Sequence, residues 1–168
     1  MTSIFLIYVV VNGMYFLDLI PPLPLSLQDS GIYHSVRRSG TQYIVVKEDS
    51  SWLRAILEYI DIYPPYHNTP GTPAYAYSAV FSPVSFSMTI IHEWQMYDTI
   101  TQKWITVTEI RLPVTGGRED GYRTYSVYPD LTSGKWRVNV KTESGQTIGR
   151  MAFTVREGIA PNLVNVVK

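Results

Sequence analysis

The 168-residue sequence predicts an all-β domain, an antiparallel sandwich or barrel, preceded by one transmembrane helix. From Ala74 onward, turn-forming residues recur about every ten residues, a spacing typical of sandwiches and barrels. Between these turns apolar and polar side chains alternate, which indicates strands with one buried and one wet face. The first twenty residues are instead almost continuously apolar, which predicts the helix.

The N-terminal segment Ile4–Ile20 (IFLIYVVVNGMYFLDLI) is interrupted only by Asn12, Gly13 and Asp18. Crossing a hydrocarbon core of roughly 30 Å takes about 20 apolar residues, and residues 1–27 just suffice. A secretory signal would need a basic start and a small-residue cleavage site, and neither is present. We therefore expect a transmembrane helix in residues 1–27 that contacts the bilayer through residues 4–20, as the last helix of a longer polytopic design. A buried core helix is the alternative.

Residues 28–72 are expected to connect this helix to the β-domain. Gln42–Glu48 (QYIVVKE) predicts a short strand because it is rich in β-branched residues. Ser50–Ile60 has helical apolar spacing, which indicates an amphipathic helix at the membrane surface; an edge strand or a core-facing helical turn fits equally well. The segment Tyr63–Pro73 is rich in turn-forming residues and marks a domain boundary. We expect the sandwich over residues 73–158 and a C-terminal tail over residues 159–168.

Six strands are expected within the sandwich. The clearest is KWRVNVK, in which Trp136, Val138 and Val140 share one face. A tight hairpin at Glu143–Gln146 follows, with Gly145 free to adopt a positive φ. The predicted strands are Tyr75–Phe81, Phe86–Tyr97, Trp104–Leu112, Gly121–Tyr128, Lys135–Thr142 and Ile148–Arg156.

Composition argues against several classes of function. Formal net charge is zero and the basic residues are scattered, so we expect no nucleic-acid partner. Cysteine is absent, and the three histidines have no ligand cluster beside them, so we expect neither a metal nor a cofactor. The glycine-containing segment Thr115–Asp120 precedes a strand rather than a helix, so it is expected to be a turn and not a phosphate loop. No nucleophile–base set stands out, and we expect a non-catalytic protein.

Five residues are candidates for binding a ligand. His92 and Trp94 share a strand face and could grip a sugar or a peptide; alternatively, Trp94 is a core residue and His92 its polar partner. Arg123 and Tyr125 also share a face and could form a recognition strip; alternatively, they make structural contacts between strands. Arg137, on the wet face of its strand, is the fifth candidate.

Four motifs are specific enough to indicate a family. They are His92-x-Trp94, the Gly121–Ser126 run GYRTYS, the Gly134–Val138 run GKWRV, and Gly149 with Phe153-x-Val155. Together they resemble the bacterial domain of unknown function 2914 family over about Ala74 to Arg156. The resemblance implies a small Ig-like β-sandwich attached behind membrane helices, and it implies no activity.

Two functions remain open. The first is a membrane-tethered, non-catalytic module that makes protein–protein contacts with another membrane protein. The second is a module that binds carbohydrate or cell wall, suggested by 13 tyrosines and four tryptophans at low charge. In either case we expect the chain in a bacterial inner membrane, with the β-domain on the extracytoplasmic side.

Overall fold

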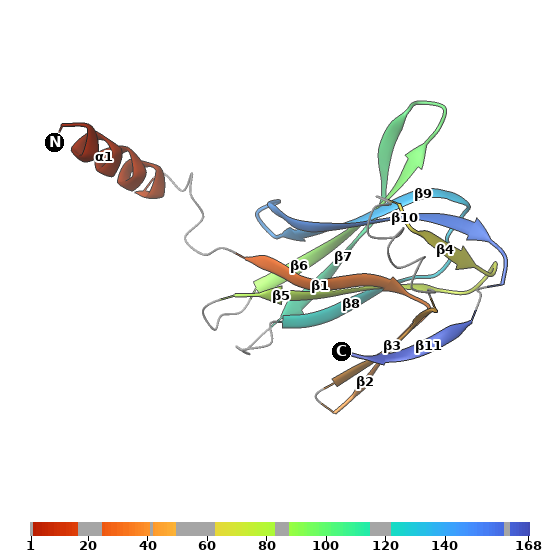
Figure 1. Ribbon diagram of the computed structural model, residues 1–168. Coiled ribbons are helices and arrows are strands. Elements are labelled where there is room, and N and C mark those ends of the chain that lie inside the picture. Colours follow the sequence, from red (N-terminus) through yellow and green to blue (C-terminus); the bar gives the residue numbers. More distant parts are fainter. Residues whose placement is uncertain are drawn as a thin grey trace.

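The computed structural model describes residues 2–16, 25–40, 42–49, 63–82, 88–114, 122–159 and 162–168. These residues form one helix and eleven strands (Figure 1). In chain order the elements are α1 (Thr2–Phe16), β1 (Ser26–Tyr33), β2 (Ser35–Ser39), β3 (Gln42–Glu48), β4 (Pro65–Asn68), β5 (Ala74–Phe81), β6 (Met88–Asp98), β7 (Lys103–Val114), β8 (Tyr122–Tyr128), β9 (Gly134–Thr142), β10 (Thr147–Glu157) and β11 (Leu163–Val167).

The strands form three sheets. The five-stranded sheet has the order β4-β10-β9-β6-β7, the middle sheet β1-β5-β8, and the small sheet β11-β3-β2. Neighbouring strands are antiparallel except β4 and β10, which run parallel. In Figure 1 the middle sheet lies between the other two, so the body has three layers.

The larger core lies between the five-stranded sheet and the middle sheet. The alternation predicted for β9 is observed, since Trp136, Val138 and Val140 are all buried there. From the middle sheet, β5 contributes small residues, among them Ala74 and Ala76, which leave room for the large rings opposite. The other buried members of this core are Tyr66, Val80, Ile90, Trp94, Val114, Tyr122, Leu131, Met151, Phe153 and Val155.

A second core lies between the middle sheet and the small sheet. Tyr77 and Ala79 point into it from the face of β5 opposite to Ala74 and Ala76, because successive strand residues face opposite ways. Its other buried members are Tyr33, Val36 and Val45. Strand β5 is therefore covered on both faces.

The mostly-β fold predicted from the sequence is confirmed. All six predicted sandwich strands are present as β5 to β10, and β3 has the predicted bounds. The β9–β10 hairpin also forms as expected, with Gly145 at φ 86°. The segments expected to be connector and tail contribute strands as well, because β1 pairs with β5 and β11 pairs with β3.

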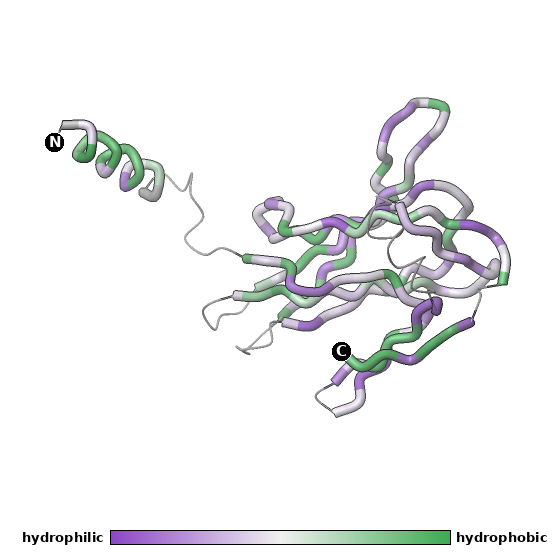
Figure 2. The backbone as a smooth tube through the Cα atoms, viewed as in Figure 1, coloured by the Kyte–Doolittle hydropathy of each residue, from purple (hydrophilic) through white to green (hydrophobic). Residues whose placement is uncertain are grey.

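The described helix α1 covers fewer residues than the expected transmembrane helix. Its 15 residues span about 22 Å at 1.5 Å per residue, against roughly 30 Å for a hydrocarbon core. Among the described residues no helix is long and apolar enough to cross a membrane, so the predicted span is not supported. The apolar side chains from Ile4 to Val11 are exposed, and α1 stands apart from the strands (Figure 2).

Two further expectations lie outside the described residues. These are the amphipathic helix at Ser50–Ile60 and the turn at Thr115–Asp120.

We predict that Gly149→Ala destabilises the body through Leu27. Strand β1 crosses β10 here, and a Cβ on Gly149 would collide with Leu27 Cδ2 and lie 3.1 Å from Leu27 Cβ. Such overpacking costs about 1–3 kcal/mol, measurable by urea unfolding. Combining it with Leu27→Ala should recover part of that cost. Strictly additive effects in the double-mutant cycle would show that the two strands do not meet as described.

Candidate functional site

Two of the predicted site residues, His92 and Trp94, lie fully buried in the larger core. The His92 ring bridges two serines of the middle sheet: Nδ1 lies 2.8 Å from Ser126 Oγ, and Nε2 lies 2.8 Å from Ser78 Oγ. Trp94 Nε1 donates to Ser126 Oγ at 3.1 Å. These bonds join the five-stranded sheet to the middle sheet, and they leave neither ring accessible to a ligand in this conformation.

Burial lowers the pKa of His92 to about 4 because the charged ring would lose its hydration. At neutral pH the ring is uncharged, with one N–H donor and one acceptor nitrogen. A hydroxyl group can serve either role, so the two serines satisfy both nitrogens. The geometry is that of a satisfied core histidine.

Arg123 and Tyr125 share one face of β8, as predicted, and that face is turned toward the small sheet. Arg123 Nη1 donates to the main-chain oxygen of Lys168 at 3.2 Å. The Tyr125 ring lies 6.2 Å, between centroids, from both Tyr43 and Tyr75. Both residues thus help to attach the small sheet to the middle sheet.

Arg137 lies on the outer face of the five-stranded sheet. Its Nε donates to Gln95 Oε1 at 2.6 Å, and its guanidinium lies 4.2 Å from the centroid of the Trp104 ring. Burial lowers the pKa of Arg137. Stacking on Trp104 and the bond to Gln95 hold the guanidinium in place over the sheet.

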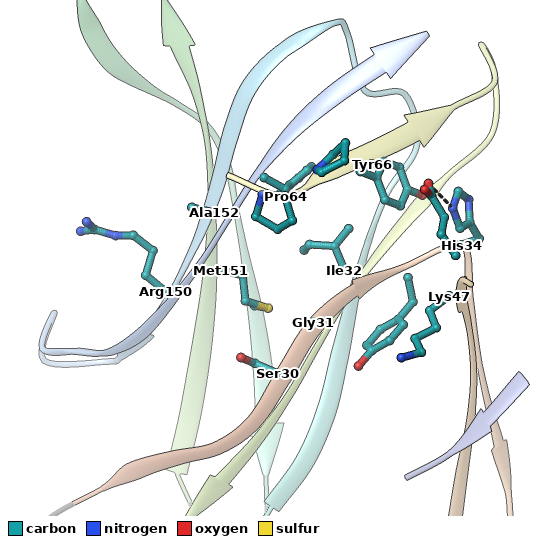
Figure 3. Close-up of a pocket in the computed structure, with 14 residues that line it drawn as sticks. Ser30, Gly31, Ile32, His34, Lys47, Pro64, Tyr66, Arg150, Met151 and Ala152 are labelled. Carbon is teal, nitrogen blue, oxygen red and sulfur yellow. Dashed lines mark hydrogen bonds and ion pairs between the residues drawn. The ribbon is translucent and has the colours of Figure 1, made fainter. Parts of the chain in front are cut away.

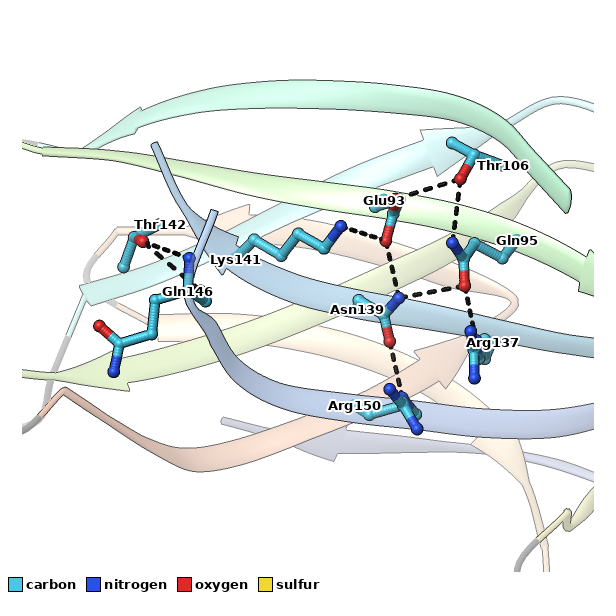
Figure 4. Close-up of polar contacts among 9 residues, drawn as sticks. All are labelled: Glu93, Gln95, Thr106, Arg137, Asn139, Lys141, Thr142, Gln146 and Arg150. Carbon is cyan, nitrogen blue, oxygen red and sulfur yellow. Dashed lines mark hydrogen bonds and ion pairs between the residues drawn. The ribbon is translucent and has the colours of Figure 1, made fainter. Parts of the chain in front are cut away.

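Arg137 belongs to a polar network centred on Glu93 (Figure 4). Glu93 Oε2 accepts from Asn139 Nδ2 at 2.7 Å and lies 2.6 Å from Lys141 Nζ, while Oε1 accepts from Thr106 Oγ1 at 3.1 Å. Burial would raise the pKa of Glu93, but these bonds together outweigh it and lower the pKa. Arg150 Nε extends the network by donating to Asn139 Oδ1 at 2.7 Å. Its polar groups satisfy one another, so it stabilises the sheet.

A pocket of about 410 Å³ lies where β1, β3, β4 and β10 meet (Figure 3). It does not include any of the five predicted site residues. Its walls come from four separate parts of the chain, which sequence spacing could not bring together. The lining residues are Ser30–His34, Lys47, Glu48, Pro64–Tyr66 and Arg150–Phe153.

Glu48 and two histidines form a cluster at this pocket. His34 Nε2 donates to Glu48 Oε1 at 3.2 Å, and His67 donates to Glu48 from its main-chain N at 2.7 Å and from Nδ1 at 2.8 Å. Burial would raise the pKa of Glu48, but the hydrogen bonds from the histidines outweigh it and lower the pKa. The described part of the chain contains no group of three such side chains arranged to hold a metal ion.

Tyr66 forms part of the pocket wall. Its ring stacks on His34 with centroids 4.5 Å apart, and only 5% of the residue is exposed. Burial raises the pKa of its hydroxyl group. Of the buried side-chain polar atoms in the described residues, this hydroxyl oxygen alone has no hydrogen-bond partner. An unpaired buried hydroxyl costs free energy unless a partner reaches it.

We predict that His92 makes stability fall between pH 7 and pH 5. Its folded pKa of about 4 lies below the unfolded value of 6.5, so the unfolded chain binds more protons in this range. The contribution of neutral His92 to the free energy of unfolding is complete above pH 6.5 and is lost as the pH falls toward 4. About 2 kcal/mol of this free energy is lost by pH 5. Urea unfolding of His92→Gln should lack this loss, whereas His67→Gln should keep it; equal pH slopes in wild type and His92→Gln would contradict the assignment.

One comparison with known proteins agrees with the family predicted from the sequence. No curated protein matches the chain. Among solved structures it is similar to an immunoglobulin-like protein from Pseudomonas aeruginosa, with 11% identity and a TM-score of 0.41 over 79% of this chain and 96% of that one. Residues 87–155 match the family model described as Protein of unknown function (DUF2914), which confirms the resemblance over those residues. The stretch from β6 to β10 is thus similar to this family of unknown function.

Proposed function

We propose that this chain is a membrane-associated, non-catalytic, Ig-like β-sandwich module that makes protein–protein contacts. The observation that carries the proposal is the exposed edge strand β7. It is outermost in the five-stranded sheet and runs for 12 residues, and among the described residues it pairs with β6 alone. The β6–β7 hairpin projects beyond the other strands (green, Figure 1).

The side chains of β7 support a contact surface. Ile105 and Val107 are exposed on it, and Ile100 is exposed in the turn that precedes it. An edge strand offers unpaired main-chain donors and acceptors, and exposed apolar residues on such an edge favour pairing with another chain. Lys103, Glu109 and Arg111 supply charges along the same strand, which favours a selective partner over general aggregation.

Helix α1 supports association with a membrane. Its exposed side chains are aliphatic or aromatic over most of the helix, and water is an unfavourable environment for them. We propose that residues 4–20 hold the chain at a bacterial inner membrane, with the β-domain on the extracytoplasmic side and another membrane protein as its partner. A reporter fused after Lys168 would show on which side of the membrane the β-domain lies.

A carbohydrate site has less support. A sugar ring needs a flat aromatic face that is open to the ligand. One half-buried group of aromatic residues comprises Tyr63, Tyr97 and Trp104, but Arg137 already lies over the Trp104 ring. Retention of the full chain on peptidoglycan, lost on Trp104→Ala, would favour the sugar over the protein partner.

We predict that Val107→Lys weakens the partner contact by at least about tenfold, because a desolvated charge replaces an apolar contact. Val127→Lys is the matched control, since Val127 is 40% exposed on β8 and Val107 is 41% exposed on β7. The measurement is quantitative cross-linking of the detergent-solubilised full chain. A lone monomer without any cross-linked protein, or equal loss in both variants, would contradict the proposed contact.

We predict that Ile4→Asp combined with Ile7→Asp abolishes flotation of the full chain with lipid vesicles. Both residues are exposed on α1, and a charged side chain is costly in a bilayer. Ile100→Asp combined with Ile159→Asp is the control, because these two isoleucines are also exposed but lie outside α1. If both double variants float as well as the wild type, α1 does not hold the chain on the membrane.

A further inference from the structure

Two arginines are neighbours on the outer face of the five-stranded sheet. Arg137 lies on β9 and Arg150 on the adjacent strand β10, where it is opposite Asn139. Because Arg137 and Asn139 are two residues apart, they share a strand face, and the two arginines are diagonal neighbours on it. Arg150 is exposed and Arg137 is half-buried. Figure 4 shows both side chains, each reached by a single dashed line.

Each guanidinium group is held by its Nε atom alone. Arg137 Nε donates to Gln95 Oε1 at 2.6 Å, and Arg150 Nε donates to Asn139 Oδ1 at 2.7 Å. The two acceptor side chains are buried and bonded to each other, since Asn139 Nδ2 donates to Gln95 Oε1 at 3.2 Å. The two guanidinium groups are therefore oriented before a ligand binds, which reduces the entropy that binding costs.

The terminal nitrogens of both guanidinium groups are available to a ligand. A guanidinium carries N–H donors on Nη1 and Nη2 as well as on Nε. The buried groups of the network satisfy one another, but no described residue accepts a hydrogen bond from the Nη atoms of Arg137 or Arg150. The Trp104 ring lies 4.2 Å from Arg137 Cζ and covers a flat face of that guanidinium, so the N–H groups at its edge stay free.

The charges of this network do not balance. Among the described residues it joins the cations Arg137, Lys141 and Arg150 to a single carboxylate, that of Glu93. Lys141 Nζ, 2.6 Å from Glu93 Oε2, neutralises that carboxylate, and Glu109 lies on β7, on the far side of Glu93 from the arginines. Burial lowers the pKa of Arg137, and the charge of Arg150 lowers it further. The two guanidinium groups thus repel each other without an anion to join them.

We propose that Arg137 and Arg150 together bind the phosphate group of a phosphate monoester. A dianion matches the two unbalanced positive charges. A planar guanidinium donates parallel hydrogen bonds to two oxygens, and the terminal oxygens of a phosphate monoester suffice to engage both guanidinium groups. A carboxylate has only two oxygens, which one guanidinium would occupy. The ester is either a soluble molecule or a lipid headgroup, and its site is separate from β7 and α1.

The test uses the full chain in detergent and methyl phosphate as the probe. Binding is followed by nuclear magnetic resonance of the arginine Nε–H groups, which are hydrogen-bonded in Arg137 and Arg150. We expect both signals to shift saturably with methyl phosphate. Dimethyl phosphate, which carries one charge, and acetate should each bind at least about tenfold more weakly, because neither satisfies both guanidinium groups.

Variants test whether methyl phosphate binds between these two arginines. Arg137→Gln and Arg150→Gln should each raise its Kd at least about tenfold, because charge-assisted hydrogen bonds are lost. Arg150→Lys keeps the charge without the planar fork and should also weaken binding. Arg156→Gln is the matched control and should change the Kd less than about twofold, since Arg156 is exposed on the same strand but lies opposite His67 of β4.

Phosphatidic acid added to the detergent micelles distinguishes the two sources of the phosphate. If it shifts the same two signals and competes with methyl phosphate, the ester is a lipid headgroup. If methyl phosphate binds equally well with and without it, the ester is a soluble molecule.

Three results would overturn the proposal: no saturable shift of either Nε–H signal, acetate binding as tightly as methyl phosphate, or an unchanged Kd in Arg150→Lys and Arg150→Gln. Val107→Lys keeps this site distinct from the proposed protein contact, because it should bind methyl phosphate normally even though its β7 contact is damaged.

Discussion

Burial of strand β5 on both faces is the constraint on which the rest of the structure depends. A strand covered on both faces needs side chains that can be buried on both faces. Strand β5 (AYAYSAVF) satisfies this requirement with small residues toward the larger core and tyrosines toward the second core. Ala74 and Ala76 leave room for Trp94 and Trp136, whereas Tyr77 fills the space under the small sheet. The single buried serine of this strand, Ser78, is used to bond His92.

The family motifs meet at this same place. His92 and Trp94 belong to one motif and Ser126 ends another, and the first two side chains both hydrogen-bond to Ser126 in the core. Trp136 of a third motif is buried beside them. These residues define how the sheets pack. Among the described residues, exposed apolar side chains lie instead on strand β7 and on helix α1.

Strands such as β9 could be predicted because an apolar and a polar face alternate along them, so that period-two alternation is visible in Trp136, Val138 and Val140. Strand β1 (SLQDSGIY) could not, since it is polar and contains Gly31, over which the Tyr33 ring lies. It becomes a strand because β5 pairs with it. Likewise, His34, Glu48 and His67 are far apart in sequence, and only the return of the chain to β4 brings them into one hydrogen-bonded cluster.

The prediction of His92 and Trp94 as ligand contacts illustrates a further limit. A histidine beside a tryptophan on one strand face gives the same pattern in a binding site and in a core, and the difference lies in what covers that face. Here the cover is the middle sheet, whose position depends on long-range pairing. The apolar N-terminal segment poses a similar problem, because composition indicates a membrane without fixing the length of the helix.

The most direct test of the three-layer arrangement is a nuclear Overhauser measurement between the rings of Tyr43 on β3 and Tyr77 on β5. Their centroids lie 5.7 Å apart across the second core, so cross-peaks between their ring protons are expected in the full chain. Absence of those cross-peaks, with Tyr77 accessible to solvent, would show that the small sheet does not cover β5 and would contradict the three-layer arrangement.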